Sequence, residues 1–174
     1  MNTDASPTSD VTHTLARYVV NSRFADLPEG VRHEGRRALL NWLGCALGGC
    51  GEVSVQRLCD ALRPFFGPAQ ATLVGLGERC DVVHAAMVNA QASNILDYDD
   101  THLATVIHPS VPVASAVLPL AERLQASGAD LLHAFILGVE VECRIGNAIC
   151  PWHYEHGWQV TARDRKSTRL NSSH

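Results

Sequence analysis

Long apolar segments with helical spacing, divided by glycine and proline, are the feature that most constrains the fold of this chain. They are rich in alanine and leucine, and aromatic residues make up only 6% of the 174 residues. Small aliphatic side chains repeated every three or four positions favour closely packed α-helices over strands. We therefore predict an all-α fold, a multi-helix domain with Ala-rich buried helices around one core.

Capping residues and helix breakers place the expected elements along the chain. Asp26 and Asp81 are expected to cap two of the helices, and Pro64 is expected to bend a third or end it early. Residues 71–75 are expected to be a short strand or extended segment. The second half of the helix that follows Asp26, and almost all of the one that follows His108, are expected to be buried. The predicted helices span residues 10–23, 28–49, 52–66, 81–96, 109–125 and 129–150.

The two ends of the chain differ in character from the part between them. Residues 1–9 are polar and are predicted to be disordered, and residues 10–161 carry the helical pattern. Residues 162–174 hold one large apolar residue and no helical period, so they are predicted to be a disordered tail. Their composition is typical of translated vector sequence, and we expect them to be foreign to the fold.

Charge and composition argue against several classes of protein. The net charge is −4 with no basic stripe, which disfavours nucleic-acid binding. No apolar run reaches the length of a membrane span, and the first ten residues lack signal-peptide order, so a cytoplasmic location is expected. Six cysteines show neither CxxC nor His/Cys zinc spacing, and a disulfide framework is not expected. Cys45, Cys59 and Cys143 are predicted to be core residues.

Polar residues are concentrated in one stretch between two apolar segments. Asp97-Tyr98-Asp99-Asp100-Thr101-His102 is followed by His108-Pro109-Ser110, although charged residues make up only 18% of the chain. Burying carboxylates together costs free energy, and active sites are where proteins accept that cost. The alternative is a solvated helix end, with His108 merely capping the next helix.

The predicted helices suggest a geometry for this stretch. If the helix from Asp81 continues, Asp97 and Thr101 are i,i+4 neighbours on one face. Pro109 suits the first position of the next helix, and the N–H groups of Ser110 and Val111 would then form an anion site. An acid/base cluster facing such a helix end suits a small carboxylate substrate.

Two charged or histidine-rich features lie further along the chain. Glu140 and Arg144 are spaced as a surface i,i+4 ion pair, which is the preferred interpretation. His153 and His156 belong to an aromatic loop over residues 152–158, and packing with solvent exposure is a more common role for such a cluster than catalysis.

The chain resembles the MmgE/PrpD family, which includes 2-methylcitrate dehydratase and cis-aconitate decarboxylase. The resemblance covers roughly residues 10–161 and implies an all-helical first domain. It also implies a smaller α+β domain that closes over the site as a lid, before which this chain is expected to be truncated. Four stretches carry the match: residues 85–90 leading to 96–102, the His108-Pro109-Ser110 step, residues 127–146, and residues 153–158.

The resemblance also suggests roles for single residues. Asp97, Thr101 and His108 match positions that line the family's active site. His108 is the acid/base candidate, oriented or tuned by Asp97, and Thr101 would hydrogen-bond substrate. Ser110, at the helix N-terminus, would bind a carboxylate. Gln159 stands where the family has a histidine, and it can hydrogen-bond a carboxylate but cannot exchange a proton near neutral pH.

The family reaction is proton abstraction next to a carboxylate with loss of water or of CO₂. We therefore expect a lyase, a dehydratase acting on a small tricarboxylate such as 2-methylcitrate, with no metal or organic cofactor. The chain alone is expected to be inactive, and the full-length protein is expected to be a homodimer. Alternatives are a cis-aconitate decarboxylase-like activity, an isomerase or epimerase of the same family, and a non-catalytic helical module that binds a partner through apolar faces.

Overall fold

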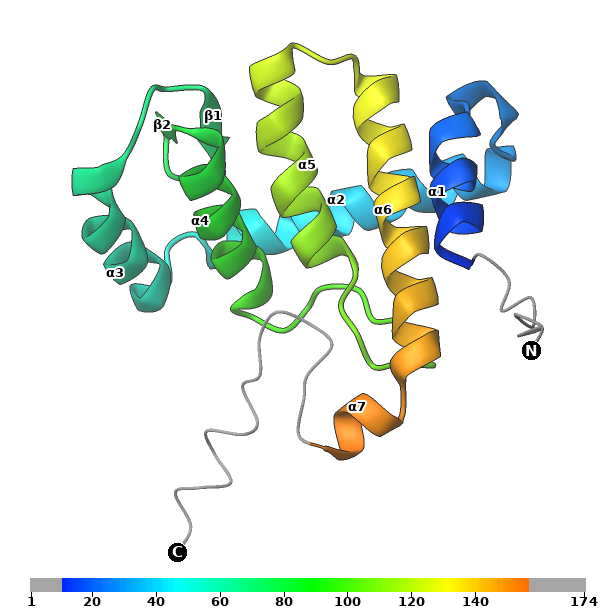
Figure 1. The fold of residues 1–174 in the computed structure, drawn as a ribbon. Helices are drawn as coiled ribbons and strands as arrows, with labels where there is room; N and C mark the ends of the chain where they lie inside the picture. The colour runs from blue at the N-terminus through cyan, green and yellow to red at the C-terminus, as the bar shows by residue number, and fades with distance from the viewer. Residues whose placement is uncertain (1–10, 157–174) are drawn as a thin grey trace, which may run out of the picture.

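The computed structural model describes residues 11–156 and is mostly helical, as predicted (Figure 1). The predicted termini 1–9 and 162–174 lie outside the described residues. No single helix in the described part is long and apolar enough to cross a membrane; α2 and α3 together pass that test only across an 85° bend. The elements are α1 (Val11–Asn21), the 3₁₀ turn η1 (Phe24–Asp26), α2 (Glu29–Gly49), α3 (Val53–Leu62), the 3₁₀ turn η2 (Arg63–Phe65), β1 (Ala71–Leu73), β2 (Glu78–Cys80), α4 (Val82–Asn94), α5 (Ser110–Leu124), α6 (Gly128–Ile149) and α7 (Trp152–Glu155).

Helices α4, α5 and α6 lie side by side and alternate in direction, while α2 crosses behind them (Figure 1). Helix α2 contacts all three, which makes it the common support of the layer. Helix α3 and the two strands lie at one end, and α1 lies at the other (Figure 1). This arrangement brings the end of α4, the start of α5 and the end of α6 to the same edge, where the polar stretch lies.

The apolar residues form two adjoining core clusters. One joins α3, the strands and α4, and includes Val55, Leu73 and Val88, all at most 1% exposed. The other joins α2, α5 and α6 around Trp42 and Phe135, each 1% exposed. The indole Nε1 of Trp42 donates a hydrogen bond to Ser115 Oγ at 3.1 Å, so even its polar atom is satisfied within the core.

A two-stranded antiparallel hairpin departs from the all-α prediction. Residues 71–73 form the expected strand, and they pair with residues 78–80, which had not been predicted as a strand. The buried side chain of Asn89 on α4 holds the hairpin, since its Oδ1 accepts from Val74 N and its Nδ2 donates to the Thr72 carbonyl, both at 2.9 Å. The second strand was missed because an isolated three-residue strand has no period to detect.

Three details of the helices also differ from the predictions. Pro28, not Asp26, occupies the N-cap of α2, and Asp26 lies in the 3₁₀ turn η1. In the second half of α2, Leu40 and Leu47 are 69% and 51% exposed, although that half was expected to be buried. Leu124 on α5, also expected to be buried, is 66% exposed. Helices α4, α5 and α6 form a single layer, so each of them keeps an outer face.

Other local predictions are confirmed. Asp81 caps α4 by accepting from the N–H groups of Val83 and His84. Helix α6 begins at Gly128, one residue before the predicted start, and Ser127 and Asp130 form a reciprocal capping box there that had not been predicted. Helix α3 ends at Leu62, before the turn that contains Pro64. The six cysteines are free; Cys45 and Cys59 are buried as expected, whereas Cys143 is only partly buried.

Replacing Asp81 by alanine should lower the free energy of unfolding by about 1–2 kcal/mol at pH 7. The N–H of Gly67 and the ring of His84 hold the pKa of this carboxyl well below its usual range. A carboxyl whose pKa is lowered by folding contributes stability at pH values above its unfolded-state pKa. That contribution is lost as the pH falls through the folded-state pKa. The difference between Asp81→Ala and the parent should therefore shrink in urea titrations below about pH 4.

The matched control is Asp60→Ala, which removes a carboxylate that pairs with Arg63 on the exposed surface. Exposed pairs contribute little, so its cost should stay below about 1 kcal/mol at every pH. Equal losses in the two variants would contradict the capping role of Asp81.

Candidate active site at the edge between α4 and α5

The polar stretch forms an irregular loop between α4 and α5. Helix α4 ends at Asn94, two residues before the predicted end. The condition for Asp97 and Thr101 to share a helical face is therefore not met. Asp97 has φ of +61°, a left-handed conformation that ends the helical path. Further along, His102 N donates to the Ile107 carbonyl at 2.8 Å and closes a small turn within the loop.

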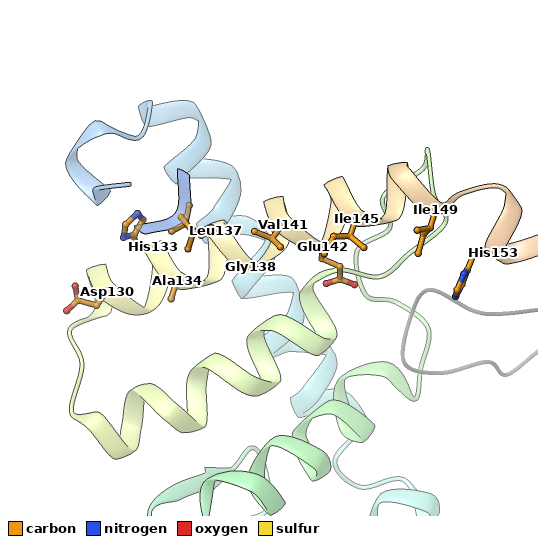
Figure 2. A pocket seen from close by; sticks show the side chains of 11 residues that line it. Asp130, His133, Ala134, Leu137, Gly138, Val141, Glu142, Ile145, Ile149 and His153 are labelled. Carbon is orange, nitrogen blue, oxygen red and sulfur yellow. The ribbon is translucent and has the colours of Figure 1, made fainter. Parts of the chain in front are cut away.

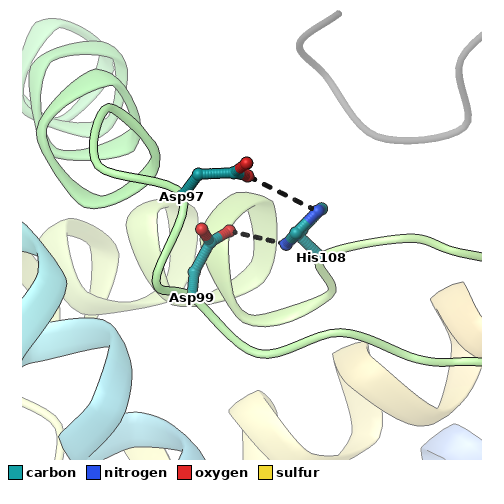
Figure 3. Close-up of side chains that lie close together, drawn as sticks. All are labelled: Asp97, Asp99 and His108. Carbon is teal, nitrogen blue, oxygen red and sulfur yellow. Dashed lines mark ion pairs between the residues drawn. The ribbon is translucent and has the colours of Figure 1, made fainter. Parts of the chain in front are cut away.

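His108 lies between two carboxylates at this edge (Figure 3). Its Nδ1 pairs with Asp99 Oδ2 at 3.1 Å, and its Nε2 pairs with Asp97 Oδ1 at 3.9 Å. The Thr101 hydroxyl lies 3.5 Å from the same Nδ1. The imidazole is 22% exposed, so it is held by the protein and still reachable from solvent. A partly exposed histidine held beside carboxylates is a common arrangement for a proton-transfer group.

Asp99 is the buried member of this cluster. Its side chain is 0% exposed, and burial raises the pKa of its carboxyl while the charge of His108 opposes that rise. Asn94 Nδ2 donates to Asp99 Oδ2 at 3.3 Å, whereas Oδ1 has no hydrogen-bond partner among the described residues. A buried carboxylate with one unsatisfied oxygen is costly, and such a group is typical of functional sites.

Asp100 fills the helix end that was predicted to bind an anion. Its Oδ1 accepts from Ser110 N at 3.2 Å, and its Oδ2 accepts from Ser110 Oγ at 2.6 Å. The start of α5 matches the prediction to within one residue, because the helix begins at Ser110 with Pro109 as the N-cap. In this structure, however, the chain's own carboxylate takes the place foreseen for a substrate carboxylate.

An apolar groove runs along α6 toward the same edge (Figure 2). It has a volume of about 900 Å³ and is lined mainly by α6 residues, with Val19 from α1 and His153 from α7. Glu142 is the half-buried carboxyl in its wall. Burial, together with the charge of Asp100, raises the pKa of Glu142 to about 7. Glu142 is therefore a second ionisable group close to the loop that sequence reasoning did not select.

Removing the charge of Glu142 should change how stability depends on pH. A folded-state pKa raised from 4.5 to about 7 gives stability that is present below pH 4.5 and lost as the pH rises through 7. Glu142→Gln should therefore flatten this fall and be more stable than the parent at pH 8 by roughly 2 kcal/mol. Urea unfolding at pH 4.5, 6, 7 and 8 tests it.

Glu140→Gln is the control, because Glu140 on the same helix forms the predicted surface pair with Arg144 at 2.6 Å. This variant should keep the pH dependence of the parent. A parent whose stability does not fall between pH 5 and pH 8 would show that Glu142 is ionised normally.

The spacing of Asp97, Asp99 and His108 would admit a cation. One donor atom from each lies within 4.8 Å of the others. A metal bound at Nδ1 would displace the 3.1 Å contact with Asp99, since a nitrogen that donates a proton has no lone pair to offer. This conflict concerns Nδ1 alone, and the absence of a required cofactor stays a prediction.

A family model that describes the MmgE/PrpD N-terminal domain matches residues 13–163. The chain belongs to the MmgE/PrpD family. The match includes the whole loop between α4 and α5 and confirms the resemblance deduced from the sequence.

Cis-aconitate decarboxylases are among the curated relatives of this MmgE/PrpD chain. That of Aspergillus terreus is 31% identical over 153 residues, which cover 84% of this chain and 31% of the relative. The Mus musculus enzyme is 31% identical over 141 residues, covering 78% of this chain and 28% of the relative. The Homo sapiens enzyme is 30% identical over the same length. The chain thus spans less than a third of the length of the relatives it matches.

The structure brings some of the predicted site residues of this MmgE/PrpD domain together and not others. His108, Asp97 and Thr101 form one cluster, while Ser110 is engaged by Asp100. Gln159 lies outside the described residues. His156 is exposed and stacks on Trp152, in keeping with the packing interpretation. Asp99 and Glu142 were missed as site residues because nothing local distinguishes a carboxylate that becomes buried from one that stays solvated.

Proposed function

We propose that this chain forms the helical part of a lyase site for a small tricarboxylate. Decarboxylation of cis-aconitate is the favoured reaction, and dehydration of 2-methylcitrate is the second candidate. The observation that carries the proposal is His108, held at 3.1 Å and 3.9 Å from two carboxylates within the family-matched loop. The relatives at 30–31% identity, named cis-aconitate decarboxylases, favour the first reaction.

Both reactions need a group that moves one proton to or from carbon. In decarboxylation, the C–C bond to the leaving carboxylate breaks as CO₂ departs, its electron pair stays on carbon, and protonation of carbon completes the product. In dehydration, a base removes a proton from carbon while the hydroxyl leaves with a second proton as water. Protonated His108 can donate the proton that carbon receives in decarboxylation. Neutral His108 can accept the proton that leaves carbon in dehydration.

The remaining assignments follow from where the side chains lie. Thr101 is exposed beside His108 and can donate a hydrogen bond to a substrate carboxylate. Ser110 can take that role only if Asp100 is displaced, because Asp100 both occupies its hydroxyl and repels a second carboxylate. Gln159 is retained as a substrate-binding candidate on the family pattern.

The test uses a protein whose reading frame extends to the length of the relatives, assayed side by side with cis-aconitate and with 2-methylcitrate. Release of CO₂ with formation of a five-carbon dicarboxylate is expected from the first. The chain of 174 residues alone is expected to turn over neither. Preferential dehydration of 2-methylcitrate would favour the second candidate, and failure with both substrates would refute the tricarboxylate assignment.

A further inference from the structure

We propose that Asp99 is the positioning residue of His108. It accepts the Nδ1 proton, fixes the ring in the Nδ1–H tautomer, and leaves Nε2 as the nitrogen that exchanges protons with a ligand. The catalytic meaning of this assignment rests on the proposed function, whereas the tautomer itself is a property of the chain.

Burial separates the roles of the two carboxylates beside His108. Asp99 is 0% exposed and its Oδ2 lies 3.1 Å from Nδ1, while Asp97 is 62% exposed and 3.9 Å from Nε2. Water screens the charge of an exposed carboxylate, and a contact of 3.9 Å is too long for a hydrogen bond. The stronger hold on the ring therefore comes from Asp99, although Asp97 is the residue that the family pattern indicates.

The surroundings of Asp99 leave its carboxylate in need of a donor. Asn94 donates to Oδ2 at 3.3 Å, and Oδ1 has no partner in the described part of the chain. A ring with its lone pair on Nδ1 would place two acceptors 3.1 Å apart in a buried site, which is unfavourable. The Nδ1–H tautomer lets His108 donate to Asp99 Oδ2 and removes that repulsion, while Oδ1 stays without a partner in the described part of the chain.

The opposite edge of the ring carries Nε2, which the Nδ1–H tautomer leaves with its lone pair. Nε2 faces Asp97 at the exposed side of the loop, and a lone pair there can accept a proton (Figure 3). Carboxylates orient many functional histidines through the other nitrogen, and beside metal-binding histidines their loss costs about 10- to 100-fold in affinity or activity. Asp99 thus supports proton transfer without touching substrate.

Nitrogen NMR on the ¹⁵N-histidine-labelled chain tests the tautomer directly. Above pH 8, His108 of the parent is expected to show a protonated Nδ1 and an unprotonated Nε2. The reverse pattern in the parent would overturn the proposal, and this measurement needs no variant to fold.

Variants of Asp99 and Asp97 then show which carboxylate fixes the tautomer of His108. Asp99→Asn should lower the ratio of Nδ1–H to Nε2–H tautomer at His108 at least tenfold, and Asp97→Asn, the matched control, should change it less than twofold. His84, paired with Asp81 at 2.6 Å at the start of α4, is the internal reference and shows that each variant is folded. Equal effects of the two variants, or a larger effect of Asp97→Asn, would also overturn the proposal.

Kinetics of the extended protein separate this inference from the proposed function. Asp99→Asn should lower kcat about 10- to 100-fold with KM nearly unchanged, because Asp99 does not contact substrate. The expected tautomer without turnover of either substrate would refute the function and leave the positioning role intact. Turnover with unaltered kcat in Asp99→Asn would refute the positioning role alone.

Discussion

A His108→Gln variant of the extended protein is expected to lose about 10²- to 10⁴-fold in kcat on its tricarboxylate substrate. Glutamine preserves part of the size and hydrogen bonding of histidine but cannot exchange a proton near neutral pH. The structure places this imidazole between the carboxylates of Asp97 and Asp99, which makes it the candidate for the proton-transfer group. Steady-state kinetics at pH 6, 7 and 8 measure the loss.

His33→Gln is the matched control for this variant. His33 is exposed on the polar first half of α2, on the surface of the molecule, and the same substitution there should leave kcat within twofold. Thermal unfolding of both variants checks that the fold is retained. Turnover of His108→Gln within a few-fold of the parent would remove His108 from the centre of the mechanism.

Gly49→Ala is expected to destabilise the fold by about 3 kcal/mol. Gly49 lies where α2 packs closely on α4, and a Cβ there would overlap the carbonyl oxygen of Ala92 and the side chain of Ile95. One of these groups is backbone and cannot move aside without shifting α4. Because Ile95 directly follows α4, the shift should also disturb the loop that carries Asp97. Urea unfolding followed by circular dichroism measures the loss.

Gly44→Ala on the same helix provides the comparison, since a Cβ at Gly44 meets no atom within 4 Å. It should raise the free energy of unfolding by about 0.5–1 kcal/mol through helix propensity. A Gly49→Ala variant as stable as Gly44→Ala would mean that α2 and α4 do not approach each other as closely as described.

Local signals predicted the helices well because a helix depends on contacts within four residues. The cap at Asp81 and the Glu140–Arg144 pair are interactions of this range, and both predictions are confirmed. Local signals did not predict the end of α4, because burial in the core determines where that helix ends. Residues 95 and 96 continue the apolar helical period, yet the helix ends at Asn94 and Ile95 packs into the core instead.

The candidate site was located from the sequence, but its internal pairing was not. The concentration of acids and histidines marked residues 97–110, and the structure places His108 beside Asp97 and Asp99 in that stretch. Asp97 was taken as the partner of His108, whereas the structure places Asp99 closer and fully buried. Asp100, which has the same chemistry, turns instead to the start of α5. Three neighbouring carboxylates thus have three environments, and spacing alone cannot rank them.

The sequence by itself determined the helical class, most helix starts, the family and the stretch that holds His108. These follow from the spacing of apolar side chains, the capping residues and the sequence motifs, all of which depend on residues close together in the sequence. Only the tertiary structure decided that Asp99 is the buried partner of His108, that Asp100 occupies the helix end, and that Glu142 carries a raised pKa. Desolvation and charge pairing depend on distances through space, and those distances exist only after α4, α5 and α6 have packed side by side.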